Sequence, residues 1–175
     1  MFNHPAYIVF DIEGAMAEEV KKLRKKFDPE RSSLHVEISL SGSCGLGAIS
    51  SNQNPQEVFA AIDKISLSIP PFFNQFDEVK RFSNTGIYYL TLQNLAPFKH
   101  SYELLKKSPI KFDECRYPFE PHCTIKLPSL QQTQIDSQIE QLSPPKDKFL
   151  IEFISVYSRT SRFGYRLLHK RHLGI

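Results

Sequence analysis

The ten residues PFEPHCTIKL, 118–127, alternate in character from His122 onward. Side chains along a β-strand point to opposite faces with a period of two. A strand at this position would therefore place His122, Thr124 and Lys126 on one face. An imidazole, a hydroxyl and an ammonium group on the same face form a set suited to the chemistry of a bound phosphate.

A second stretch, LHVEISL at 34–40, alternates in the same way and also begins with a histidine, His35. Its inward face would carry His35, Glu37 and Ser39. The two histidines are about half the chain apart, and each opens the middle strand of a strand–helix–strand–helix–strand series. Weak internal repetition of this kind predicts two related lobes packed around a shared cleft.

Hydrophobic periodicity predicts the elements of both halves. Strands are expected at 6–12, 34–40, 72–82, 86–92, 122–127, 149–158 and 164–173, and helices at 15–27, 55–67, 97–107 and 129–142. The 175 residues suffice for a single bilobal domain, 1–175, with lobe 1 over about 1–83 and lobe 2 over about 84–175. The terminal strands are candidates for exchange between the lobes.

The composition restricts the class of protein. A net charge of +3 is compatible with a phosphorylated or nucleic-acid substrate but too small for a coat on long duplexes. The three cysteines lack a CxxC pair, which argues against a zinc site or a disulfide framework and favours a reducing, cytoplasmic setting. Neither a secretion signal nor a membrane span is visible, and we expect a soluble monomer.

Two histidines facing one cleft can divide acid and base duty because the imidazole titrates near neutral pH. Cleavage of a phosphodiester needs one neutral imidazole to accept a proton and one imidazolium to donate one. Thr124 and Lys126 could stabilise the charge that develops on the phosphate, and this chemistry requires neither a metal nor another cofactor. Each positioned acid or base contributes roughly a factor of 10² to 10⁴ in rate.

The paired strands resemble the two-histidine (2H) phosphoesterase superfamily, which includes the 2′-5′ RNA ligase and RNA 2′,3′-cyclic phosphodiesterase proteins. Its mark is a His-x-Thr/Ser motif followed by an apolar residue in each of two lobes. FEPHCTIKL is similar to the second motif, with Phe119 and Pro121 ahead of the histidine. ISVYSRTSRFGYRLLHKRHL resembles the closing hairpin of the family, with Tyr165 after a glycine-containing turn.

The resemblance implies an α+β fold of two pseudo-symmetric βαβ-type lobes, with antiparallel sheets facing a central cleft and helices outside. It also implies a phosphodiesterase acting on a 2′,3′-cyclic phosphate, an RNA end or another small phosphodiester, with 2′-5′ RNA ligation as the reverse reaction. His122 would be the base, His35 the acid and Thr124 a hydrogen-bond donor to the phosphate.

The first motif departs from this pattern because Glu37 stands where the family has Thr or Ser. A carboxylate there repels a phosphate and removes a hydroxyl donor, but it also favours the protonated form of a nearby imidazole. Two interpretations stay open. Glu37 holds His35 as the acid of an active enzyme, or the first half-site has decayed and the protein is a weakly active or non-catalytic binder of RNA or nucleotides.

Further candidates for substrate binding lie in the C-terminal hairpin. Arg159 could contact a phosphate at the mouth of the cleft, and Tyr157 and Tyr165 could stack on a base. His169 and His172 would point to opposite faces of a strand, so they are poor joint metal ligands. A small RNA-recognition module is a third interpretation, but the sequence lacks the aromatic-rich run that such a sheet uses.

Overall fold

The structure is a computed structural model of the chain, and it describes residues 1–128 and 133–175. Its strands are β1 (Ala6–Ile12), β2 (Val36–Ser39), β3 (Phe72–Asn74), β4 (Phe76–Arg81), β5 (Tyr88–Leu92), β6 (Cys123–Lys126), β7 (Phe149–Ile151), β8 (Phe153–Arg159) and β9 (Tyr165–His172). Its helices are α1 (Gly14–Phe27), α2 (Pro55–Ser66), α3 (Ala96–Lys106) and α4 (Thr133–Glu140), with a short 3₁₀ turn, η1, at Pro29–Arg31.

The strands form three sheets, and each pairing between the named strands is antiparallel. One sheet has the order β2-β1-β8-β9, a second has the order β4-β5-β6, and β3 pairs with β7. The prediction of an α+β fold with antiparallel sheets is therefore confirmed. Each of the two larger sheets draws on both halves of the sequence, and the internal symmetry and the lobe boundary near residue 83 stay predictions.

Two predicted strands are each divided between sheets. The run 72–82 breaks at Gln75 into β3, which pairs with β7, and β4, which pairs with β5. The side chain of Asn74 holds this junction, because its Oδ1 accepts the Gln75 N–H at 2.8 Å while its Nδ2 donates to the Asn94 carbonyl at 2.7 Å. The run 149–158 breaks at Glu152 in the same way, into β7 and β8.

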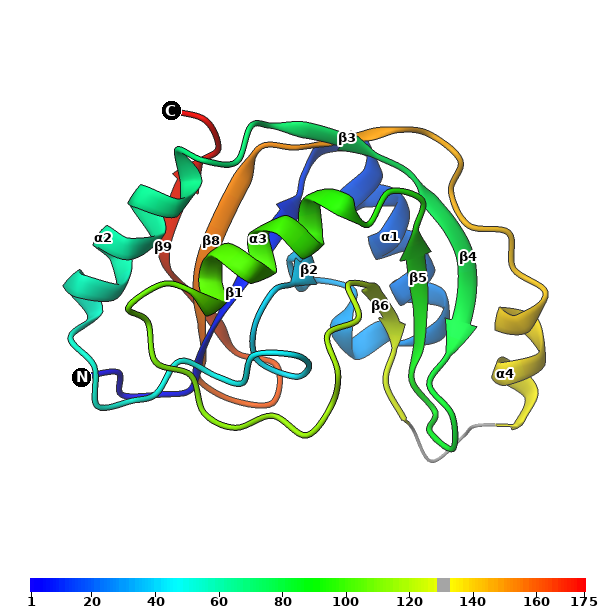
Figure 1. Cartoon of the computed structure of the whole chain (residues 1–175). Helices are drawn as coiled ribbons and strands as arrows, with labels where there is room; N and C mark the ends of the chain where they lie inside the picture. Colours follow the sequence, from blue (N-terminus) through cyan, green and yellow to red (C-terminus); the bar gives the residue numbers. More distant parts are fainter. Residues whose placement is uncertain (129–132) are drawn as a thin grey trace.

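The two strands that follow the histidines lie at the edges of different sheets and contact one another. β2 is the edge of the four-stranded sheet and β6 is the edge of the three-stranded sheet. Helix α1 packs against both of them, so it joins the two sheets (Figure 1). This arrangement brings His35 and His122, each one residue ahead of its strand, to the same region of the molecule.

Helices α2 and α4 lie further from this region. Helix α2 packs against β9 and α4 packs against β4, at opposite ends of the molecule in Figure 1. The helix predicted at 129–142 is present over Thr133–Glu140, and its first four predicted residues, Leu130 among them, lie outside the described residues. In the part of the chain that is described, none of the helices has the length and apolar character needed to cross a bilayer.

Candidate functional site

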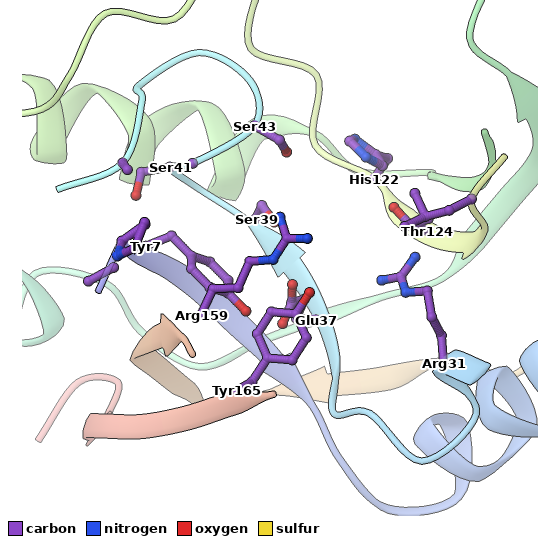
Figure 2. Close-up of a pocket in the computed structure, with 15 residues that line it drawn as sticks. Tyr7, Arg31, Glu37, Ser39, Ser41, Ser43, His122, Thr124, Arg159 and Tyr165 are labelled. Atoms are coloured by element: carbon purple, nitrogen blue, oxygen red, sulfur yellow. The ribbon is translucent and has the colours of Figure 1, made fainter. Parts of the chain in front are cut away.

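A cavity of about 300 Å³ opens where the edges of β2 and β6 meet. Small-molecule sites in proteins commonly start at about this size. Its lining includes two arginines, a carboxylate and several hydroxyls (Figure 2): Arg31, Arg159, Glu37, Ser39, Ser41 and Ser43. His122 and Thr124 complete the lining on the β6 side, so the cavity has the composition of an anion-binding site.

His122 lines the cavity with a defined tautomer. Its Nδ1 lies 2.6 Å from the Glu120 carbonyl oxygen, and because a carbonyl can only accept, Nδ1 carries the proton. In the neutral ring the other nitrogen, Nε2, is then the proton acceptor. Burial lowers the pKa of His122 and the hydrogen bond to Glu120 only partly offsets this, so the neutral form is favoured. This is the state that a general base needs.

Aromatic rings hold His122 from two sides. Phe82 and Tyr89 each meet its ring at a centroid distance of 5.0 Å, with interplanar angles of 82° and 62°. The Tyr89 hydroxyl donates to Glu120 Oε1 at 2.7 Å, which fixes the residue whose carbonyl orients the imidazole. The ring of His122 is therefore positioned by packing as well as by its hydrogen bond.

A β-bulge in β6 separates Lys126 from the other two residues of the opening motif. Tyr88 of β5 lies opposite Lys126, and the next residue, Tyr89, lies opposite Thr124, so β6 has one extra residue here. Since neighbouring side chains of β5 point to opposite faces, Thr124 and Lys126 do so as well. The predicted common face is wrong at this point, and Leu127 lines the cavity where Lys126 was expected.

Lys126 instead points toward α4. Its side chain is fully buried, its Nζ lies 3.7 Å from Asp136 Oδ1, and it donates to the Leu127 carbonyl at 3.4 Å. It lies 5.9 Å from the centre of the Tyr88 ring. Lys126 is thus part of the packing between β6 and α4.

His35 lies behind Glu37 and is not among the residues that line the cavity. Its Nε2 contacts Glu37 Oε2 and lies 3.4 Å from the Tyr7 hydroxyl, while the Glu37 and Tyr7 side chains line the cavity. The ring of His35 stacks on Tyr157 at a centroid distance of 3.9 Å and an angle of 8°. The cavity wall on the β2 side therefore presents a carboxylate that is backed by an imidazole.

The aromatic residues of the C-terminal hairpin have different places. Tyr165 lines the cavity and meets the edge of His35, at a centroid distance of 5.4 Å. Tyr157 lies under His35, where its hydroxyl donates to Asp11 Oδ1 at 3.1 Å. Burial raises the pKa of Tyr157 and of Asp11. Tyr157 thus supports the histidine, whereas Tyr165, together with Arg159, faces the cavity.

Arg31 is a lining residue that the sequence analysis did not single out. It lies in η1, which connects α1 to β2, and its guanidinium extends toward Thr124 in Figure 2. Its Nη1 is buried without a hydrogen-bond partner in the described structure. Burial, and then the charge of Arg24, lower the pKa of Arg31, so an anion in the cavity would relieve an existing electrostatic cost.

Arg24 of α1 connects the two histidine-containing segments through hydrogen bonds to their backbone. It is 1% exposed, its Nη1 donates to the His35 carbonyl at 2.9 Å, and its Nε donates to the Thr124 carbonyl at 3.1 Å. The sequence does carry a signal for this role, because Arg24 follows Val20 by four residues on the apolar face of α1. A cation at such a position is buried only where it is paired or hydrogen-bonded.

The described residues contain no group of three or more histidine, cysteine, aspartate or glutamate side chains that could hold a metal ion. The polar groups that line the cavity are of kinds that bind an anion or move protons: an imidazole, a carboxylate, guanidinium groups and hydroxyls.

The chain is similar over nearly its whole length to several solved structures. Escherichia coli LigT in complex with 3′-AMP matches 97% of this chain and 98% of its own, with a TM-score of 0.63 and 16% identity. A phosphoesterase matches with the same coverage, a TM-score of 0.59 and 15% identity. The Thermus thermophilus protein TT0787 matches 97% of this chain and 98% of its own, with a TM-score of 0.64 and 11% identity. No protein-family model and no curated protein sequence matches the chain.

The chain therefore has the fold of LigT and of a solved phosphoesterase, which is the fold that the sequence resemblance predicts.

Proposed function

We propose that this protein is a metal-independent phosphodiesterase that opens a 2′,3′-cyclic phosphate, or a related phosphodiester of RNA or a nucleotide, by two-histidine acid–base catalysis. The observation that carries the proposal is the state of His122, a neutral base whose protonated Nδ1 is bound to the Glu120 carbonyl at the wall of an arginine-lined cavity. Solved LigT structures hold 3′-AMP, phosphate, NADP⁺ and ATP, which supports a nucleotide as the ligand here.

In the proposed reaction, water attacks the phosphorus atom of the cyclic phosphate while Nε2 of His122 takes its proton. A P–O bond forms to the water oxygen, and the P–O bond to one ribose oxygen breaks. The His35–Glu37 pair returns a proton to that leaving oxygen. The products are a phosphomonoester and a free hydroxyl, so one water is consumed and no further reactant is needed.

Arg31 and Thr124 supply the electrostatic part of the proposed mechanism. The negative charge on the phosphate oxygens grows in the transition state, and preorganised donors in a water-poor cavity stabilise it. Thr124 offers a hydroxyl on the β6 side, and Arg31 offers a guanidinium that can bind two phosphate oxygens at once. With the 5′-hydroxyl of a second RNA end in place of the water, the same acid and base would form a 2′-5′ linkage: the 5′-oxygen bonds to phosphorus, the P–O bond to the 3′-oxygen breaks, and the 3′-oxygen takes the proton.

The test is turnover of adenosine 2′,3′-cyclic phosphate by the full chain and by two variants, His35→Ala and His122→Ala. Each substitution should lower kcat by a factor of about 10² to 10⁴. The control is His100→Ala, since His100 is exposed on α3 and outside the cavity. Activity should persist in EDTA. Turnover by either variant at the rate of the unmodified chain, or loss of activity in EDTA, would contradict the proposal.

One observation favours a second candidate function, a non-catalytic nucleotide binder on the same scaffold. Glu37, rather than His35, lines the cavity, so the first half-site presents a carboxylate where an acid is needed. Binding of adenosine 2′,3′-cyclic phosphate or its hydrolysis products without turnover, lost when Arg31 is replaced by Gln, would select this function over the first.

A further inference from the structure

The cavity places a carboxylate beside the groups that attract an anion. Glu37 lines it, and its side chain is only 18% exposed, so water and salt screen its charge weakly. In the view of Figure 2 the carboxylate lies between Arg31 and Thr124 on one side and Arg159 on the other. In a cavity of this size, a phosphate bound beside His122 and Thr124 therefore lies close to a charge of its own sign.

The positive charge of the cavity is partly offset before any ligand binds. Burial and then the charge of Arg24 lower the pKa of Arg31, and the carboxylates of Asp28 and Glu37 act on that guanidinium in the opposite direction. Arg159 also lines the cavity, but it is exposed, so water weakens its attraction for an anion. The net attraction is thus limited, and it suits a ligand of low charge.

The contact with His35 leaves the Glu37 carboxylate facing the cavity. The imidazole Nε2 contacts Glu37 Oε2, but His35 is not among the lining residues. A ligand therefore meets the carboxylate of this pair rather than the imidazole. In the proposed reaction His35 gives its proton to the leaving oxygen, so after the chemical step the carboxylate has a neutral imidazole beside it.

We propose that Glu37 makes this site select phosphodiesters and exclude phosphomonoesters by their charge. The inference rests on the proposed function, and it gives a role in specificity to the residue that departs from the sequence motif. A phosphodiester carries one negative charge, whereas a phosphomonoester carries about −1.5 to −2 at pH 7. The additional charge increases the repulsion from Glu37, and like charges brought together at a binding site lower affinity strongly.

The same repulsion favours release of the product. Opening of a 2′,3′-cyclic phosphate converts a diester with one negative charge into a monoester, which loses a second proton with a pKa of about 6. The ligand therefore gains charge as a result of the reaction, while the carboxylate of Glu37 stays in the wall of the cavity. Glu37 thus weakens binding of the product more than binding of the substrate.

The experiment measures equilibrium binding of two ligands that differ by one charge. They are 2′-deoxyadenosine 3′-phosphate, which is a monoester, and its methyl ester, which is a diester. Neither has the 2′-hydroxyl that is needed to form a cyclic phosphate. Isothermal titration calorimetry at pH 8, where the monoester has lost its second proton, gives the Kd of each. We expect the unmodified chain to bind the diester at least about tenfold more tightly than the monoester.

Two variants remove the charge of Glu37. Glu37→Gln keeps the length of the side chain and Glu37→Thr shortens it, so an effect common to both follows from charge rather than from space. Each should tighten binding of the monoester by about tenfold and reduce the preference for the diester. Glu30→Gln is the matched control, because Glu30 precedes Arg31 in the chain but is exposed and outside the cavity. That variant should keep the full preference.

A gain in affinity cannot come from a variant that fails to fold, so the expected result is distinct from simple loss of structure. Equal Kd values for the two ligands in the unmodified chain would overturn the inference. So would an unchanged Kd of the monoester in Glu37→Gln, a gain confined to Glu37→Thr, or absence of binding of both ligands to every form of the chain.

Failure of the inference and failure of the proposed function give different results. Any of the contradicting binding results, obtained together with turnover of adenosine 2′,3′-cyclic phosphate, would overturn the role of Glu37 in selection and leave the phosphodiesterase in place. The expected binding results without turnover would overturn the proposed function and leave the selection by charge as a property of a nucleotide-binding site.

Discussion

Glu37 stands between the cavity and His35: its carboxylate lines the cavity and is also the ion-pair partner of the His35 imidazole. The substitution that distinguishes the first motif thus places a carboxylate in direct contact with the imidazole that the proposed mechanism uses as the acid.

Removing the Glu37 carboxylate should lower the rate of the reaction. Glu37→Gln takes away the group that contacts the His35 imidazole, so the proposed acid loses its partner and kcat/KM should fall by a factor of about 10². The measurement is kcat/KM for a 2′,3′-cyclic nucleotide between pH 5 and pH 9. Glu30→Gln, an exposed carboxylate outside the cavity, serves as the control. An unchanged or higher kcat/KM in Glu37→Gln would contradict the role of the pair.

At the acid end of the same pH profile, the fall in activity should follow the protonation of His122. A base must be neutral to accept a proton, so activity falls as the pH drops through the His122 pKa. Because burial lowers that pKa below its usual value near 6.5, we expect the acid limb below pH 6.5. Glu120→Gln, which keeps the carbonyl but removes the Tyr89-bound carboxylate, should shift the limb only slightly. An acid limb above pH 7 would be incompatible with a neutral buried base.

Arg31, rather than Lys126, should carry the electrostatic contribution to catalysis. Arg31→Gln removes a guanidinium from the cavity lining and should lower kcat/KM by a factor of about 10². Lys126→Met alters a fully buried side chain that points toward α4, and should change kcat/KM by no more than about twofold. Steady-state kinetics of the two variants decide the matter. A larger loss of kcat/KM for Lys126→Met than for Arg31→Gln would instead support the stabilisation of phosphate charge that strand alternation predicts for Lys126.

Arg24 should contribute to the stability of the fold. Arg24→Met leaves the carbonyls of His35 and Thr124 without their donors, and we expect a loss of about 3 kcal/mol in the free energy of unfolding. Urea denaturation measures this as a lower midpoint with an unchanged slope. Lys25→Met, at an exposed neighbouring position, is the control and should stay within about 0.5 kcal/mol. Equal midpoints for the two variants would contradict the bridging role.

The elements themselves were predictable because they follow from local patterns. The apolar run at 6–12, the alternation in 34–40 and the apolar spacing in 15–27 depend only on which sides of an element meet the core. The repeated His-containing strand and the resemblance to the 2H phosphoesterases led to the α+β fold, which the structure and its solved neighbours confirm.

Tertiary structure decided where each polar side chain points and what it contacts. Lys126 leaves the face of Thr124 because one extra residue in β6 reverses the alternation, and a bulge depends on the partner strand β5. Arg31 reaches the cavity from a 3₁₀ turn that has no periodic pattern to read. Arg24 acquires its two acceptors only when β2 and β6, separated by much of the chain, come together over α1. Periodicity specifies the faces of an element, whereas long-range pairing specifies which charges share a cavity.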